Sequence, residues 1–238
     1  MCSVRSIRNL LWPSMLWQAL GQLNGHADAV MFRPKNSGYC FPMKALSVSL
    51  LTVCGLTDLP SHKARGITHV LSLLDPGWPE PEAFRDFGPH HRTTLRFHDV
   101  VEPRPDQVLP SDAHVREILG FGRALASDGR ALGPGRLLVH CHMGISRSTA
   151  ALLILLAQAH PHEDEEVLLE WLRGIRPQAW PNSRMIAFAD EQLDRGGRLI
   201  QALGRHYAHQ LAIEPSLAKP MREGGRGSEV AMGLRAAA

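Results

Sequence analysis

One stretch decides the fold of this chain: Val139-His140-Cys141-His142-Met143-Gly144-Ile145-Ser146-Arg147-Ser148. It follows a short apolar run at 137–139 and leads into a second apolar run at 150–157. The first run predicts a buried strand, and the second, which is apolar on all sides, predicts a helix buried in the middle of the domain. A buried strand that passes through a short loop into a buried helix favours an α/β fold.

The loop in this stretch has the features of an anion-binding site. Five residues separate Cys141 from Arg147, and Gly144 lies between them. A loop of this kind can turn its backbone N–H groups inward at a helix N-terminus, and glycine permits a turn that a side chain would obstruct. Such surroundings lower the pKa of a thiol from about 8.5 to roughly 3.5–7.5. We therefore expect Cys141 to be a thiolate nucleophile and the Arg147 guanidinium to bind two phosphate oxygens.

The pattern His-Cys-x-x-Gly-x-x-Arg-Ser at 140–148 resembles the signature loop of the protein tyrosine phosphatase superfamily. Its Gly-Ile-Ser-Arg-Ser ending resembles the dual-specificity branch, in particular small bacterial tyrosine-phosphatase-like proteins. The resemblance extends over roughly residues 46–195. It implies a single α/β domain with a central, mostly parallel sheet flanked by helices. It also implies hydrolysis of phosphate monoesters through a cysteinyl-phosphate intermediate.

The resemblance also implies a role for each residue of the loop. Cys141 would attack phosphorus, Ser148 would help the thiolate to leave in the second step, and the His140 ring would order the loop. The phosphate would be held by the Arg147 side chain and by backbone amides of His142, Met143, Gly144, Ile145, Ser146 and Arg147. The His142 side chain would add partial positive charge. Asn182 would cap its helix or help to position water or substrate, and capping is the preferred interpretation.

The mechanism needs a general acid for the leaving oxygen, and Asp99 is the candidate. It follows a predicted strand at 93–98, where related enzymes place their acid. Asp99 lies 42 positions before Cys141, which is more than the dual-specificity pattern predicts. Glu102 and Asp106 on the same loop remain alternatives.

Hydrophobic periodicity and turn residues predict the remaining elements. Strands are expected at 46–56, 68–74 and 93–98, with a short helix at 59–66 that Gly66 ends. Strand, helix and strand in that order predict a βαβ unit. Prolines and glycines favour a loop at 75–91. Further helices are expected after the N-cap Ser111, from the acidic residues 163–166, which favour the N-terminal end of a helix dipole, and lastly from about 182 to 193.

The length of 238 residues suits one domain with extensions. We expect the phosphatase domain at 43–210, preceded by a poorly ordered extension at 1–42. Translation could equally begin at Met43, and the resemblance of residues 5–29 to a secretion signal is faint. Residues 211–238 are rich in Gly, Ala, Arg and Glu, which predicts a disordered tail.

Composition excludes several classes of function. The net charge is only +3 and the basic residues are scattered, which argues against nucleic acid as a partner. The sequence contains no run of 18 apolar residues, so no stable membrane insertion is expected. The four cysteines and 13 histidines form no metal-binding pattern, and the mechanism requires no metal or other cofactor. Reduced thiols in a cytoplasmic protein are the simplest account. Cys54 is expected in the core, although a reversible disulfide with Cys141 is conceivable.

Three rival functions share parts of this pattern. Phosphoinositide phosphatases often carry lysine in the loop, whereas positions 142, 143, 145 and 146 hold no lysine. This difference favours a phosphoprotein or a simple phosphomonoester as substrate. Rhodanese-type sulfur transfer fits the spacing to Arg147 and the Ser148 hydroxyl less well. A non-catalytic module that binds phosphopeptides would keep Arg147 without turnover. The sequence leaves open the choice between phosphotyrosine and phosphoserine, and the oligomeric state.

Overall fold

The computed structural model describes residues 45–238, except for the side chains of residues 129, 130 and 132. The predicted extension at 1–42 therefore lies outside the described residues, as does the alternative start at Met43.

Four parallel strands form one sheet. In sheet order they are β1 (Val48–Cys54), β4 (Gly135–His140), β2 (His69–Leu74) and β3 (His91–Arg96). β4 is an inner strand, with Val139 paired to Val53 of β1 on one side and to Leu71 of β2 on the other. The predicted mostly parallel sheet is confirmed and is parallel throughout. β3 begins two residues before the predicted strand, at the end of the predicted loop.

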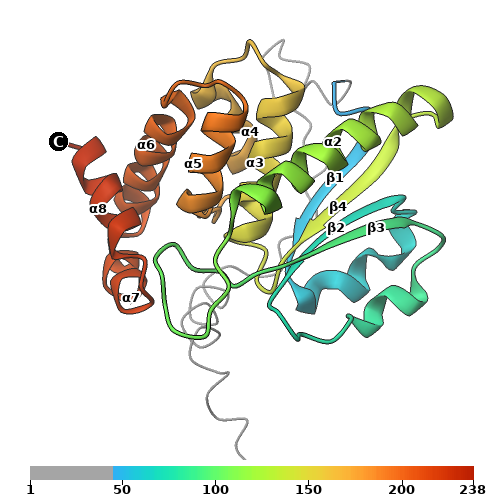
Figure 1. Ribbon diagram of the computed structural model, residues 1–238, viewed down its shortest axis with the longest axis horizontal. Helices are drawn as coiled ribbons and strands as arrows, with labels where there is room; N and C mark the ends of the chain where they lie inside the picture. The colour runs from blue at the N-terminus through green and yellow to red at the C-terminus, as the bar shows by residue number, and fades with distance from the viewer. Residues whose placement is uncertain (1–44) are drawn as a thin grey trace, which may run out of the picture.

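The two faces of the sheet are covered differently (Figure 1). One face packs against α2 (Asp112–Leu132) and α3 (Arg147–Ala159), and Leu137 and Val139 of β4 point into this larger core. The other face is covered by two 3-10 helices, η2 (Leu56–Arg65) and η3 (Glu82–Asp86), which pack against Leu138. Because successive strand residues face opposite sides, one apolar strand contributes to both cores.

Ser111, Asn182 and Gly66 mark helix ends as predicted, whereas η2 begins three residues before the predicted helix at 59–66 and η3 lies within the predicted loop at 75–91. Ser111 caps α2 by accepting a hydrogen bond from the His114 N–H. Asp164 caps α4 (Glu165–Ile175), and Asn182 caps α5 (Ser183–Gln192) by accepting from the Met185 N–H. Gly66 ends η2 in the left-handed conformation. α3 is buried from Arg147 to Ala157, as the all-round apolar run predicts.

The C-terminal segment contradicts the sequence prediction of a disordered tail at 211–238. After α6 (Arg198–Ile213) the chain forms η4 (Pro215–Leu217), α7 (Ala218–Glu223) and α8 (Gly227–Ala236), so α5 is not the last helix. Val230 is fully buried, and a Cβ added at Gly233 would lie 2.9 Å from the Tyr207 Cβ. A segment of biased composition is therefore ordered because its few apolar and small residues let α8 approach α6 closely.

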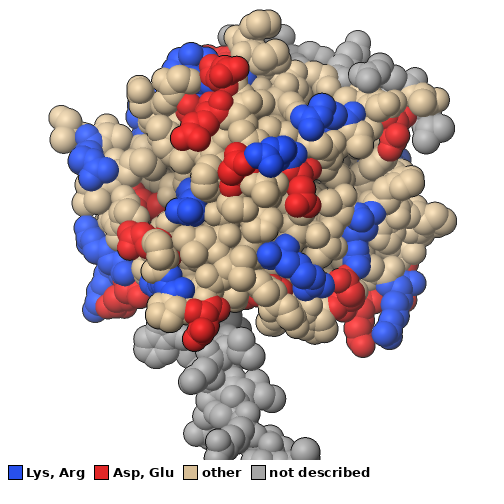
Figure 2. Space-filling model, in the orientation of Figure 1, with Lys and Arg blue, Asp and Glu red and all other residues tan. Residues whose placement is uncertain are grey.

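The face of the molecule shown in Figure 2 carries charges of both signs. Figure 2 shows acidic and basic side chains interspersed on the face in view. Within residues 45–238, no helix combines the length and the apolar character that crossing a bilayer requires.

Candidate active site

The candidate site lies at the carboxyl ends of the two inner strands. Cys141 directly follows β4, and Asp75 directly follows β2. Parallel neighbours end at the same edge of a sheet, so the topology brings these two positions together. Arg147 opens α3 at the same place, because only the loop 141–146 separates β4 from that helix.

The loop turns its carbonyl groups away from Cys141. Each carbonyl from residue 142 to residue 146 accepts a hydrogen bond from the surrounding structure. The donors are Leu56 N to His142 O (2.9 Å), Arg176 Nη2 to Met143 O (3.2 Å), Arg176 Nε to Gly144 O (2.9 Å), Trp180 N to Ile145 O (2.9 Å) and Thr149 Oγ1 to Ser146 O (2.9 Å). In a planar trans peptide the next N–H points opposite to the carbonyl, so the amides of residues 143–147 face the inside of the loop. This is the arrangement of an anion nest.

Gly144 is required by the closeness of this loop to β1. Its φ is +68°, and a Cβ added there would lie 2.4 Å from the backbone carbon of Cys54. The positive φ disfavours any residue with a side chain, and the Cys54 backbone leaves no room for a Cβ at this position.

Two groups contact the sulfur of Cys141. The Ser148 hydroxyl lies 3.2 Å from Sγ, and the Gly144 N–H donates to Sγ at 3.2 Å. The thiol is 2% exposed. Both contacts can stabilise negative charge on sulfur, as a nucleophile requires and as a leaving thiolate requires again in a second step.

In the part of the chain that the structure describes, the hydrogen bonds of the Arg147 guanidinium lie at Nη1. Its Nη1 donates to Asp75 Oδ1 at 2.6 Å and to the Phe97 carbonyl at 2.6 Å. Its Nε is buried and has no hydrogen-bond partner among the described residues. A buried donor without an acceptor is costly, so an oxyanion bound in the loop would supply what the protein leaves unsatisfied.

The two histidines that flank Cys141 are uncharged at neutral pH. Burial lowers the pKa of His140 to about 4, and its Nε2 lies 2.6 Å from the Ser72 hydroxyl. Burial and the nearby Arg147 charge lower the pKa of His142 to about 4. The expectation that the His142 side chain adds positive charge is therefore wrong. Its ring instead packs against the half-exposed Trp78, with centroids 4.3 Å apart.

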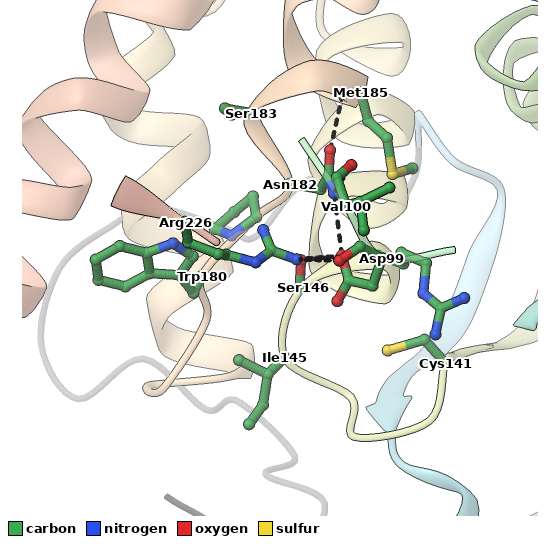
Figure 3. A network of polar contacts seen from close by, with 12 residues as sticks. Asp99, Val100, Cys141, Ile145, Ser146, Trp180, Asn182, Ser183, Met185 and Arg226 are labelled. Carbon is green, nitrogen blue, oxygen red and sulfur yellow. Dashed lines mark hydrogen bonds and ion pairs between the residues drawn. The ribbon is translucent and has the colours of Figure 1, made fainter. Parts of the chain in front are cut away.

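Asp99 lies in a polar network beside the loop (Figure 3). Its Oδ1 accepts hydrogen bonds from the Ser146 hydroxyl (2.8 Å) and from Asn182 Nδ2 (3.0 Å), and it forms an ion pair with Arg226. Burial by itself would raise the pKa of Asp99, but the charges of Arg226 and Arg147 outweigh it and hold this pKa below its ordinary value. Asp99 is therefore a carboxylate.

This environment conflicts with the sequence-based choice of Asp99 as general acid. A general acid must hold a proton before the reaction, whereas the Asp99 carboxylate is surrounded by donors. The two alternatives, Glu102 and Asp106, have exposed side chains on the connection between β3 and α2. Asn182 both caps α5 and donates to Asp99, so its capping role is confirmed and a contact with the network is added.

Sequence reasoning missed three residues of this site. Asp75 could have been found, because it follows a strand predicted to lie parallel to the one before Cys141. Arg176 and Arg226 left no signal, since each reaches the site from a helix end far along the chain.

Cys54 belongs to the smaller core, as expected, and burial raises the pKa of its thiol. Cys54 and Cys141 are both free thiols. Among the described residues, no cluster of three or more His, Cys, Asp or Glu side chains could hold a metal ion.

No protein-family model and no curated protein matches the sequence. Among solved structures, the chain is similar to the Yvh1 phosphatase domain from Chaetomium thermophilum, with 27% identity and a TM-score of 0.41 over 63% of this chain and 93% of that one. It is similar to the human tyrosine phosphatase-like serine/threonine/tyrosine-interacting protein, with 18% identity and a TM-score of 0.47 over 63% and 95%. It is also similar to human DUSP28, with 17% identity and a TM-score of 0.45 over 61% of this chain and 92% of that one.

The Yvh1 domain is named a phosphatase, and the human interacting protein is named tyrosine phosphatase-like. All three TM-scores lie below 0.5, so the case for the chemistry rests on the geometry of the site itself.

Proposed function

We propose that this chain is a cysteine-dependent phosphatase that hydrolyses phosphate monoesters through a cysteinyl-phosphate on Cys141. The observation that carries the proposal is the loop around the thiol, with five carbonyls turned outward and the buried Arg147 Nε left without an acceptor within residues 45–238. Inward amides and a guanidinium fork match the three non-bridging oxygens of a phosphoryl group.

In the first step the Cys141 thiolate attacks phosphorus. The S–P bond forms, the bond from phosphorus to the ester oxygen breaks, and the leaving oxygen takes the electron pair. The loop amides and Arg147 hold the phosphoryl oxygens throughout, so they stabilise the charge of the transition state.

In the second step water attacks the phosphorus of the cysteinyl-phosphate. The new P–O bond forms, the P–S bond breaks, and the Ser148 hydroxyl at 3.2 Å stabilises the departing thiolate. Asp99 hydrogen-bonds to Ser146 of the loop and is ionised, which is the state needed to accept the proton of the attacking water.

Protein phosphotyrosine, or phosphotyrosine together with phosphoserine, is the proposed substrate class. The absence of lysine from the loop positions 142, 143, 145 and 146 argues against substrates that carry several phosphates. The free thiols of Cys54 and Cys141 fit the reducing cytoplasm, which we propose as the compartment.

The experiment is hydrolysis of a chromogenic aryl phosphate in the presence of a chelator. Wild type should turn over, whereas Cys141→Ser and Arg147→Ala should both be inactive. Cys141→Ser should still unfold at the wild-type temperature. A Cys141→Ser variant with wild-type activity would refute the assignment of the nucleophile.

The second candidate is the non-catalytic phosphopeptide-binding module. It is favoured by one observation, the ion pair that leaves Asp99 without a proton to donate. A folded wild type that binds phosphotyrosine peptides but hydrolyses neither these peptides nor aryl phosphates would replace the phosphatase with this function.

A further inference from the structure

Arg226 reaches the candidate site from the C-terminal segment, at the turn between α7 and α8. Its side chain is 3% exposed. Its Nη2 pairs with Asp99 Oδ1 and donates to the Asp99 carbonyl at 3.2 Å and to the Ser146 hydroxyl oxygen at 2.9 Å. One guanidinium nitrogen thus joins the carboxylate to the phosphate loop (Figure 3).

The other side of the Arg226 guanidinium is fixed by Glu229. Nη1 donates to Glu229 Oε2 at 3.0 Å and to Oε1 at 3.2 Å. Glu229 is buried and accepts three further hydrogen bonds, from Trp180 Nε1 (2.7 Å), the Ser183 N–H (2.8 Å) and the Tyr207 hydroxyl (3.1 Å). Arg226 therefore cannot turn away from Asp99 without breaking a buried network.

The network also occupies the hydroxyl of Ser146. Ser146 is the N-cap residue of α3, yet its side chain makes no capping hydrogen bond. It donates to Asp99 and accepts from Arg226 instead, so the first amides of α3 stay available to an anion.

Resting on the proposed function, we propose that Arg226 is a specificity-determining residue. Its buried ion pair keeps Asp99 ionised, and this confines turnover to phosphate esters whose leaving group departs without receiving a proton, aryl esters in preference to alkyl esters. Arg226 acts through Asp99 and does not itself contact the substrate.

The first step of this reaction needs no proton from the protein when the leaving group is an aryloxide. The thiolate displaces an aryloxide, which leaves with the electron pair of the broken P–O bond and later takes a proton from water. An alkoxide is too basic to leave in this way. General acid catalysis is typically worth about 10²–10⁴-fold, so a chain without it should discriminate against alkyl esters by roughly this amount.

The test compares aryl phosphates of increasing leaving-group basicity with an alkyl phosphate such as phosphoserine, in wild type and in Arg226→Met/Glu229→Gln. The double variant removes both charges of the pair, so that no buried Glu229 carboxylate is left without its partner. The partly buried Asp99 then lacks the Arg226 charge, so its pKa should rise. The Arg147 charge and the hydrogen bonds from Ser146 and Asn182 still act to lower it. Arg222→Met is the matched control, because Arg222 is an exposed arginine of the same segment.

In wild type kcat/KM should fall steeply as the leaving group becomes more basic. In the double variant the ratio of alkyl to aryl kcat/KM should rise at least about 10-fold, and alkyl turnover should fall again as the pH rises and Asp99 loses its proton. Arg222→Met should keep the wild-type ratio. A merely structural role for Arg226 would lower both rates and leave their ratio unchanged.

Asp99→Asn keeps the inference testable if the double variant does not fold. It should leave the ratio of alkyl to aryl kcat/KM unchanged, because an ionised Asp99 protonates neither leaving group. A selective loss of alkyl hydrolysis, or a wild type that hydrolyses both esters equally well, would overturn the inference while leaving the phosphatase intact. A wild type that hydrolyses no ester would overturn both.

Discussion

Arg147 and Asp75 form an ion pair in which Nη1 lies 2.6 Å from Oδ1, and the arginine side chain is only 3% exposed. Asp75 therefore orients the guanidinium from the far side and leaves the Nε edge for an oxyanion. The pair also explains why an aspartate follows the apolar strand β2, where the buried positive charge of Arg147 needs a partner.

Replacing Asp75 with alanine should weaken phosphate binding without removing the nucleophile. A hydrogen bond between charged groups contributes about 1.5–3 kcal/mol, so KM for an aryl phosphate and Ki for orthovanadate should each rise about 10- to 100-fold. Asp86→Ala is the control, because Asp86 is an exposed aspartate whose ion pair with Lys63 lies on the surface. Equal Ki values for Asp75→Ala and wild type would show that Asp75 does not position Arg147.

Gly144→Ala should disrupt the loop far more than an ordinary glycine substitution. The added Cβ would lie 2.4 Å from the Cys54 backbone, so β1 or the loop must move, and aryl phosphate hydrolysis should fall at least about 100-fold. Gly196→Ala is the matched control, since Gly196 also has a positive φ but its nearest neighbour would be 3.9 Å away. The control should lose only about 1 kcal/mol of stability and keep its activity. Similar activity losses in the two variants would contradict the steric account.

Buried neutral histidines should make the fold less stable in mild acid. Burial lowers the pKa of His140 and of His206 to about 4 from an ordinary value of 6.5. The unfolded chain therefore binds more protons between these values, so the free energy of unfolding should fall as the pH drops from 6.5 toward 4. The loss is at most about 1.4 kcal/mol per pH unit for each group.

Urea unfolding at pH 7 and pH 5 measures this loss. His206→Gln is the informative variant, because His206 lies on α6 outside the loop and hydrogen-bonds to the Ala179 carbonyl. It should show a smaller difference between the two pH values than wild type. A wild type equally stable at both values would refute the prediction.

The sheet, the buried helix α3 and the turn between β4 and α3 could be predicted from the sequence, because these features depend on local patterns of apolar residues and glycine. Apolar runs define β2 and β4, and side-chain caps at Ser111 and Asn182 define helix starts. Adjacency in a parallel sheet then brings Cys141 near Asp75, although the sequence alone did not draw attention to Asp75.

The C-terminal segment could not be predicted in the same way. Its helices are stabilised by contacts distant in sequence, such as the Arg226–Asp99 ion pair and the approach of Gly233 to Tyr207. The composition of this segment predicted disorder, and no sequence pattern indicates that residue 226 contacts residue 99. The same contact helps to hold the pKa of Asp99 below its ordinary value, so one contact across 127 positions bears both on the C-terminal segment and on the choice of Asp99 as general acid.

The central claim, covalent catalysis by Cys141, is tested most directly by trapping the intermediate. Ser148→Ala removes the hydroxyl that lies 3.2 Å from the sulfur and should slow hydrolysis of the cysteinyl-phosphate more than its formation. Quenching this variant in acid during turnover of an aryl phosphate, followed by peptide mass spectrometry, should reveal a phosphoryl group on Cys141. Turnover that leaves Cys141 unmodified, with phosphate on another residue or on none, would contradict the account.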